Sequence, residues 1–206
     1  MKTLKTIILL ALLGIFSSQV EAQKISLEEG SLEFLKGISE LNVNYDFSDF
    51  GVGKFDTEAE YIEKKKTEYN EDEPGKGDEW EQQWHADKEN TYQRRFEELM
   101  NTVFISKDAN ILVAEDNEAT HTLILKTTFM EPGFNVGISS KNASINVEVI
   151  FIKTDDPDNH LAVISMNKVP GNALFGTDFD AEQRIGAAYA QAGQKLAQYL
   201  WKKALK

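Results

Sequence analysis

The sequence predicts an α/β (α+β) fold in which a mostly antiparallel, mixed sheet of roughly four to five strands packs against two to three helices. Three observations lead to this prediction. Residues 41–48 alternate between apolar and polar side chains, residues 57–103 carry apolar side chains at helical spacing, and residues 111–166 return to a strand pattern before a last helix. The expected order is strand, helix, helix, three or four strands, helix.

The first strand and the first helix follow from local patterns. The alternation in residues 41–48 has the period of a half-buried strand. Acidic side chains crowd the first turn of the predicted helix 57–70, where they are favourable to the helix dipole. The inward stripe of this helix is expected at Ala59, Ile62, Lys66 and Tyr69.

A second helix is predicted after the Pro-Gly break at residues 73–77, with Asp78 as its capping residue. The poor helix propensity of residues 89–91 predicts a break in its middle. Its apolar stripe comprises Trp80, Trp84, Tyr92, Phe96, Leu99 and Val103.

The strands of the second half are predicted at residues 111–114, 122–130, 144–152 and 161–166, joined by turn clusters at 131–133 and 155–159. These short connections favour an antiparallel meander. Leu123, Leu125 and Phe129 are expected to share the inner face of one strand. The run 161–166 is apolar on both faces, which indicates a central position.

The last helix is predicted to begin at Asp180 and to end near Lys203. Glycine inside a helix costs roughly 1 kcal/mol relative to alanine. Gly186 and Gly193, with several alanines, are therefore expected to let the helix backbone approach the sheet closely.

The first residues match the three-part pattern of a secretory signal peptide: Lys2 and Lys5, an uncharged apolar run, and a small residue at Ala22. Cleavage after Ala22 gives a leader of residues 1–22 and a single α/β domain of residues 23–206, which is expected to be periplasmic or secreted. The apolar run is shorter than the roughly 20 residues that a membrane span needs. No direct membrane insertion is therefore expected once the leader is removed.

Charge and cysteine content exclude several classes of function. The net charge is −12, and the leader (Lys2, Lys5, Glu21) contributes +1, so the remaining chain carries −13. Such a charge disfavours binding to nucleic acids, because that binding needs clustered Lys and Arg. It also disfavours docking on anionic lipid headgroups. The chain has no cysteine, which excludes disulfides, thiolate metal sites, cysteine nucleophiles and lipid attachment at cysteine.

Segments spread over most of the mature chain carry a resemblance to a known group; they are residues 43–53, 131–137, 178–180 and 184–193. They resemble uncharacterised exported proteins of Gram-negative bacteria. The C-terminal half is also similar to the α/β domain of outer-membrane accessory lipoproteins, in which a Tyr-Ala-x-Ala-Gly helix backs a sheet. This chain departs from those lipoproteins because it has no cysteine to acylate. The resemblance implies a fold and a compartment, and no activity or site.

The sequence shows no motif in which reactive side chains have the spacing of a catalytic or metal site. His85, His121 and His160 stand far apart without metal-ligand spacing, and no Gly-x-Ser-x-Gly elbow is present. The loop 155–159 offers oxygen ligands but lacks the EF-hand pattern. Asp46 and Asp49 are interpreted as a chance pair among 34 acidic residues rather than as a glycosidase dyad. We therefore expect no catalytic residue, no metal and no cofactor.

The ligand-binding candidates are aromatic. Trp80 and Trp84 share one helix face at i and i+4, where they form either a carbohydrate or peptide platform or part of the core stripe. Phe134, Phe175 and Phe179 lie beside glycines in two loops and form either a ligand-binding rim or buried anchors.

The leading interpretation is a non-catalytic binding or cell-envelope accessory module whose partner is an unknown envelope protein or an extracellular ligand. One alternative is a secreted or periplasmic hydrolase that uses carboxylates, which requires a pocket with two or more acids of shifted pKa. Another alternative is a homo-oligomeric structural component, which requires a self-complementary apolar face on the last helix.

Overall fold

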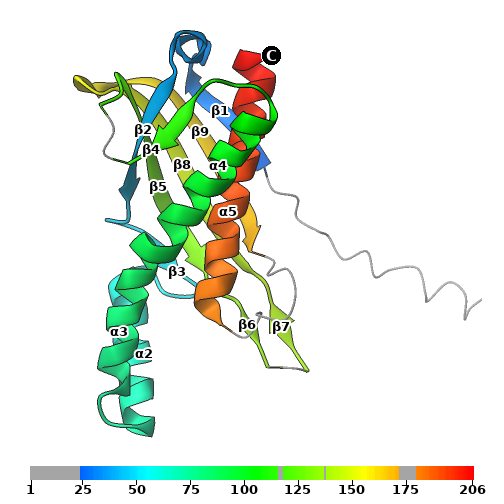
Figure 1. Ribbon diagram of the computed structural model, residues 1–206. Coiled ribbons are helices and arrows are strands. Elements are labelled where there is room, and N and C mark those ends of the chain that lie inside the picture. Colours follow the sequence, from blue (N-terminus) through cyan, green and yellow to red (C-terminus); the bar gives the residue numbers. More distant parts are fainter. Residues whose placement is uncertain (1–23, 116–117, 137, 172–179) are drawn as a thin grey trace, which may run out of the picture.

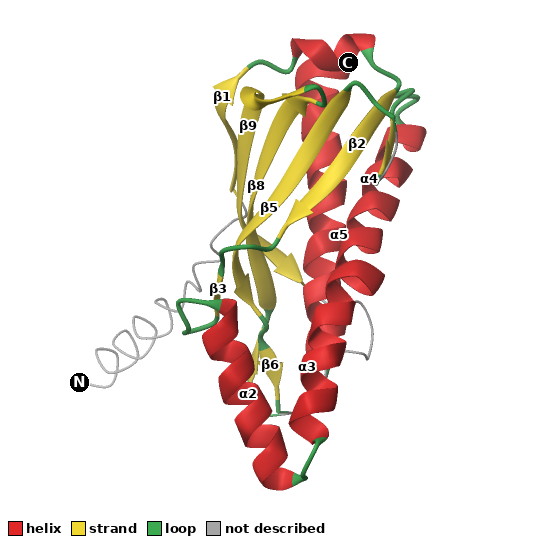
Figure 2. Ribbon diagram, turned by 90° about the vertical axis from the view of Figure 1, so that its left-hand side faces the viewer, coloured by secondary structure: helices red, strands yellow, loops and turns green. Residues whose placement is uncertain are grey.

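The fold is a seven-stranded sheet with two long helices on one face and a helical hairpin that extends beyond one end of the sheet (Figure 1, Figure 2). The computed structural model describes residues 24–115, 118–136, 138–171 and 180–206, so the predicted leader lies outside the described residues. The strands are β1 Lys24–Gly30, β2 Glu40–Asp46, β3 Gly51–Val52, β4 Leu112–Ala114, β5 His121–Glu131, β6 Phe134–Asn135, β7 Ser140–Lys141, β8 Ala143–Lys153 and β9 Asp156–Gly171. The helices are η1 Glu33–Gly37, α2 Glu58–Asp72, α3 Lys76–Asp87, η2 Lys88–Gln93, α4 Arg94–Ser106, α5 Ala181–Leu200 and η3 Trp201–Leu205.

The sheet confirms the predicted mixed α/β class. Its strand order is β1-β9-β8-β5-β2-β4, with β3 paired to β5. The strands β5, β8, β9 and β1 pair antiparallel, as a meander does, whereas β2 runs parallel to both β4 and β5. The chain returns from β2 to β4 and β5 through the helices, and such a crossover is what parallel pairing requires.

Two strands of the seven-stranded sheet, β1 and β3, were not predicted from the sequence, and neither were β6 and β7 of the separate two-stranded sheet. β1 carries no clean alternation of burial, and β3 is only two residues long. They raise the number of strands in the sheet to seven, above the predicted four to five.

The face predicted for β5 is correct for Leu123 and Leu125, which are fully buried, and wrong for Phe129. The pairing of β5 with β8 shifts register between Thr127 and Phe129. A β-bulge of this kind reverses which side chains point inward. Met130 is therefore fully buried, and Phe129 is only partly buried.

The first helix begins where the sequence predicts, because Thr57 and Glu60 form a capping box. Its buried residues are Tyr61 and Ile62, however, and Ala59 is exposed. The predicted stripe was partly wrong because α2 packs on α3 through aromatic rings: Tyr61 lies 5.9 Å from Trp80 between ring centroids.

The second predicted helix is a continuous rod made of α3, η2 and α4. Its N-cap is Gly75 in the left-handed conformation, with φ of 93°, and not Asp78. Asp78 lies in the first turn instead, where its carboxylate pairs with Lys66 at 2.9 Å. The predicted break at residues 89–91 takes the form of a π-helical turn, η2, within an unbroken rod.

The core lies between the sheet and the pair α4 and α5. Helix α5 begins at the predicted residue, since Asp180 accepts a hydrogen bond from the Glu182 N–H at 3.0 Å. A Cβ atom on Gly193 would lie 2.1 Å from the carbonyl oxygen of Phe96, on α4. At this position the small residue therefore allows close packing of helix on helix, where the sequence analysis expected helix on sheet.

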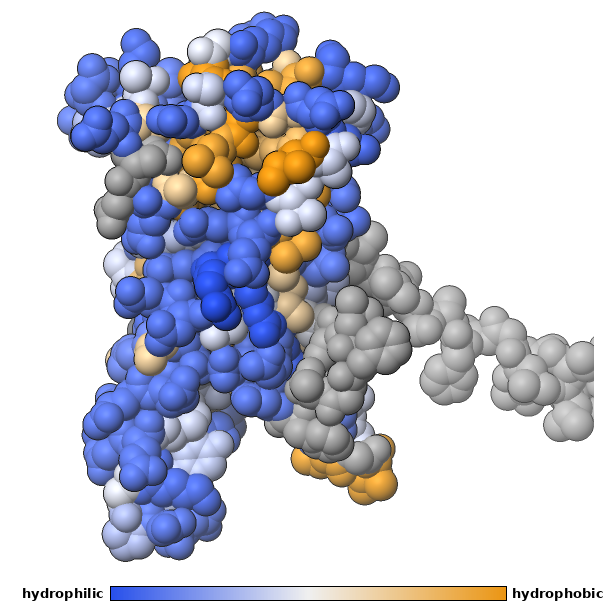
Figure 3. Space-filling model, viewed as in Figure 1, coloured by the Kyte–Doolittle hydropathy of each residue, from blue (hydrophilic) through white to orange (hydrophobic). Residues whose placement is uncertain are grey.

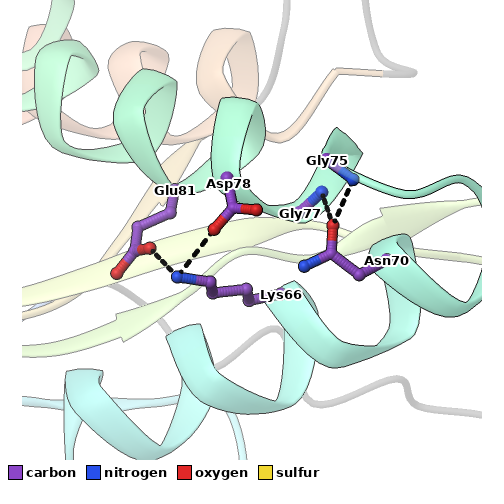
Figure 4. A network of polar contacts seen from close by, with 6 residues as sticks. All are labelled: Lys66, Asn70, Gly75, Gly77, Asp78 and Glu81. Atoms are coloured by element: carbon purple, nitrogen blue, oxygen red, sulfur yellow. Dashed lines mark hydrogen bonds and ion pairs between the residues drawn. The ribbon is translucent and has the colours of Figure 1, made fainter.

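Two projections extend from the end of the sheet near β3 (Figure 2). We call the hairpin of α2 and α3 the arm, and the β6–β7 hairpin the finger. The polar contacts that close the arm are drawn in Figure 4: Asn70 Oδ1 accepts hydrogen bonds from the N–H groups of Gly75 (3.1 Å) and Gly77 (2.8 Å), and Lys66 pairs with Asp78 and Glu81.

The finger carries exposed apolar side chains. Phe134, Val136 and Ile138 are 44%, 66% and 101% exposed, and Figure 3 shows an apolar patch at this end of the molecule. None of the helices in the described part of the chain is long and apolar enough to cross a membrane.

Candidate functional site

A cleft of about 470 Å³ lies at the base of the arm, where four parts of the chain meet. Helix α2 and helix α3 form one wall. The turn after β5, at Pro132 and Gly133, and the first turn of α5 form the other. The cleft therefore lies between the arm on one side and the sheet with α5 on the other.

Four aromatic side chains line the arm side of the cleft: Tyr61, Tyr69, Trp80 and Trp84. Trp80 is partly buried and contacts all three of the others, with ring centroids 5.6 to 5.9 Å apart. Because neighbouring rings hold Trp80 in place, its exposed part presents a fixed apolar surface to the cleft.

Trp84 is buried behind Trp80, and a polar contact fixes its orientation. Its indole N–H donates to the Glu58 carboxylate at 2.6 Å, and the same carboxylate pairs with Lys88 at 2.7 Å. The Lys88 ammonium also lies over the rings of Phe47 and Phe50, at 5.2 and 5.5 Å from their centroids. This group ties both helices of the arm to the segment after β2.

Arg184 forms the opposite wall. It is buried, and its guanidinium donates to the carbonyl oxygens of Pro132 (3.1 Å) and Gly133 (3.2 Å). The Gly133 N–H donates in turn to Glu131 at 3.0 Å. The backbone groups of this turn are thus bonded within the protein, and the first turn of α5 is fixed against the end of β5.

Two phenol groups in the cleft have unused hydrogen-bonding capacity. Tyr61 is 9% exposed and Tyr69 is partly buried, and no described residue hydrogen-bonds to either hydroxyl. Burial raises the pKa of Tyr61, so the hydroxyl keeps its proton. Lys65, which also lines the cleft, pairs with Glu68 at 3.1 Å and lies over the Tyr69 ring.

Acidic groups are few on the cleft surface. Asp180 is the single acid among the described residues that line it. Asp87 is buried nearby and does not line the cleft; burial, together with Glu182 and Asp180, raises its pKa to about 6, while the hydrogen bond from Gln83 opposes the shift. Within the part of the chain that the structure describes, the paired acids of shifted pKa that a carboxylate hydrolase needs therefore do not face this cleft.

The structure separates the predicted binding residues. It brings Trp80 and Trp84 together in the cleft, with Trp84 buried. Phe134 lies on the finger, one residue beyond the cleft residue Gly133. Phe175 and Phe179 lie outside the described residues.

Sequence reasoning missed the other half of the cleft. Tyr61, Lys65 and Tyr69 recur at four-residue spacing and so share one face of α2, a signal that could have placed them together. Arg184 gave no local signal, because its partners are backbone carbonyls of a turn 51 and 52 residues away.

The three histidines lie at surface or strand positions, and the acidic segment 156–159 lies at the start of β9. His85 and His160 are exposed, and His121 stacks on Phe34 with ring centroids 5.1 Å apart. The turn predicted at residues 155–159 is shorter in the structure, because β9 already begins at Asp156, and Asn159 of that strand donates to both carboxylate oxygens of Asp156, at 2.8 and 3.0 Å. Within the described residues, no group of three or more His, Asp or Glu side chains is arranged to hold a metal ion.

Comparison with known proteins gives structural likeness only. No family model and no curated protein matches the chain. A PelC dodecamer from Paraburkholderia phytofirmans is similar in structure, with 11% identity over 89% of this chain and 99% of that chain and a TM-score of 0.41. A PelC variant dodecamer from the same organism gives 10% identity, coverage of 90% and 100%, and a TM-score of 0.42. A DUF330 protein from Xanthomonas campestris is 17% identical over 49% of this chain and 58% of that chain, with a TM-score of 0.32.

Proposed function

We propose that this chain is an exported binding module, without catalytic activity of its own, that takes its ligand in the aromatic cleft at the base of the arm. The observation that carries the proposal is the convergence of four aromatic side chains from two helices on a cleft closed by α5 and the turn after β5. Ligand sites are typically concave and apolar, with a few polar groups that fix orientation. This cleft has that composition.

The same residues argue against the two alternatives. A carboxylate hydrolase needs two acids at a set separation across a cleft, and among the described residues only Asp180 lines this one. An assembly through the small residues of α5 needs that face to be free. Gly193 is instead packed against Phe96 of α4 within the same chain.

The compartment is proposed from the leader-like segment at residues 1–22, and the partner is an envelope protein or an extracellular ligand. N-terminal sequencing of protein purified from its native source tests the compartment. A first residue of Gln23 is expected, and a chain that still begins at Met1 contradicts export by cleavage.

The binding site can be tested through the three tryptophans, Trp80, Trp84 and Trp201. Each gives one indole N–H signal in a nitrogen-15 spectrum, which is assigned with single Trp→Phe variants. The small-molecule fraction of a bacterial envelope extract is expected to shift the Trp80 signal. Trp201, beyond the far end of α5, serves as the internal control. A shift confined to Trp201, or no shift, contradicts a ligand site in the cleft.

A further inference from the structure

We infer that the ligand of the aromatic cleft is a neutral saccharide of one or two rings, stacked on Trp80 and hydrogen-bonded to the hydroxyls of Tyr61 and Tyr69. This inference rests on the proposed function and specifies its ligand class. Three properties of the cleft support it: its charge, its aromatic surface, and the bonding state of its backbone.

The charged groups at the cleft already have partners within the protein. The guanidinium of Arg184 is bonded to two carbonyl oxygens, and the Lys65 ammonium is paired with Glu68. Asp180 uses its carboxylate to cap α5. Among the described residues at the cleft, Glu68 balances the charge of Lys65, and Arg184 and Asp180 carry opposite charges, so no net charge remains for an ionic ligand to neutralise. An uncharged ligand fits this surface better than a charged one.

The groups that remain are those that recognise a polyhydroxylated ring. A phenol hydroxyl both donates and accepts hydrogen bonds, so it can pair with a ligand hydroxyl of either orientation. Tyr61 supplies such a group at 9% exposure with no partner in the described chain, and Tyr69 supplies a second. Between them, the exposed part of Trp80 offers the apolar surface on which the C–H face of a sugar ring can pack.

The backbone of the cleft argues against a peptide in an extended conformation. Such a peptide gains affinity from main-chain hydrogen bonds to free backbone groups of its host. The carbonyl groups of Pro132 and Gly133 are bonded to Arg184, and the Gly133 N–H is bonded to Glu131. Proline has no N–H to offer. The volume, about 470 Å³, is within the usual range for small-ligand sites.

The inference is tested by titrating the full mature chain with defined probes and following the three indole signals. The probes are the neutral disaccharides cellobiose and N,N′-diacetylchitobiose, the charged disaccharides digalacturonate and diglucosamine, and the tripeptide Gly-Leu-Gly. We expect at least one neutral disaccharide to shift Trp80 and not Trp201. Tyr61→Phe is expected to weaken that binding by roughly 3- to 10-fold, the effect of one neutral hydrogen bond. Trp80→Ala is expected to abolish it, which is measured by isothermal titration calorimetry because this variant lacks the Trp80 signal.

Matched variants separate recognition from folding. Tyr199→Phe removes a phenol hydroxyl at the other end of α5 and is expected to leave binding unchanged. Tyr69→Phe, at a partly buried position, provides a second hydroxyl deletion if Tyr61→Phe or Trp80→Ala fails to fold. Equal binding by Tyr61→Phe, Tyr69→Phe and the parent chain would overturn the assigned hydrogen bonds.

The outcomes also separate the ligand class from the binding function. If a charged disaccharide or the tripeptide shifts Trp80 and the neutral disaccharides do not, the assignment of a neutral saccharide is overturned and the binding function survives. The same holds if only the envelope extract shifts Trp80. If no probe and no extract shifts Trp80, both proposals fail.

Discussion

The core layer and the arm are stabilised by different forces. Between the sheet and the pair α4 and α5, side chains such as Leu123, Phe96 and Tyr189 are completely buried. In the arm, α2 and α3 have few buried residues, and ion pairs, the Asn70 hydrogen bonds and the aromatic cluster hold the two helices together. The core therefore gains its stability from buried apolar area, and the arm gains its position from a small number of specific contacts.

This difference matters because the proposed binding cleft lies where the two regions meet. One wall belongs to the arm and the other to the start of α5. Regions with few buried apolar contacts open at lower free energy than the core. We therefore expect the arm wall of the cleft to be the part that adjusts to a ligand, while the wall formed by Arg184 stays fixed.

The largest expected effect is on the core. Gly193→Ala places a Cβ atom 2.1 Å from the Phe96 carbonyl oxygen, so α4 and α5 must move apart. We expect a loss of about 3 kcal/mol in the free energy of unfolding, at the upper end for overpacking. Urea denaturation measures it. Gly37→Ala is the control, because a Cβ there meets no atom within 4 Å. Equal stability of both variants would show that the helices are not in close contact.

The next effect is on the base of the arm. Glu58→Ala removes the acceptor of the Trp84 indole and the partner of Lys88, in a pair whose side chains are only 16% and 15% exposed. We expect a loss of about 2 kcal/mol, the size of a hydrogen bond to a charged group. Hydrogen exchange is expected to accelerate in α2 and α3 and not in β5 and β8. Glu33→Ala, in an exposed pair with Lys36, is the control. Uniform acceleration in all elements would contradict a separately held arm.

A pH effect on stability is expected from Asp87, a buried acid near the junction of the core layer and the arm. The pKa of Asp87 is raised from 3.8 to about 6, mainly by burial, so the folded state favours its protonated form. Its contribution to stability is therefore complete below pH 4 and is lost as the pH rises through 6. Asp87→Asn is expected to be more stable than the parent at pH 7.5 by about 1 to 2 kcal/mol, and the advantage disappears at pH 4.

The control for this pH effect has the opposite sign. The pKa of Asp78 is lowered by its hydrogen bond and ion pair with Lys66, so Asp78→Asn is expected to lose stability at neutral pH rather than gain it. Urea midpoints of both variants at four pH values provide the measurement. A pH-independent difference between Asp87→Asn and the parent chain contradicts the raised pKa.

Local sequence patterns predicted most of the core layer. The alternation in β2 and β8 identified buried positions such as Val43 and Val149, and the cap at Asp180 identified the start of α5. The errors arose where tertiary contacts decide the outcome. The bulge in β5 reversed Phe129, and the parallel pairing of β2 depends on a crossover that no local pattern reveals.

The cleft was only half predictable. Trp80 and Trp84 stood out because two tryptophans share a helix face. Tyr61, Tyr69 and Lys65 share a face of the preceding helix, but sequence alone does not show that this face meets the tryptophans. Arg184 lies opposite them because α5 starts beside the turn after β5, and that juxtaposition is a property of the sheet order.

The smallest expected effect is at the tip of the arm, far from the core. Asn70→Ala removes the oxygen that accepts from Gly75 and Gly77, and it leaves the N–H of the buried Gly77 without that acceptor (Figure 4). We expect a loss of about 1 kcal/mol, typical of one neutral hydrogen bond. Faster amide exchange at Gly75 and Gly77 is the direct readout. Asn70→Asp keeps an oxygen acceptor and is expected to retain more of the stability than Asn70→Ala. If the two variants exchange equally fast, the side-chain oxygen does not hold this turn, and the arm is then positioned from its aromatic base alone.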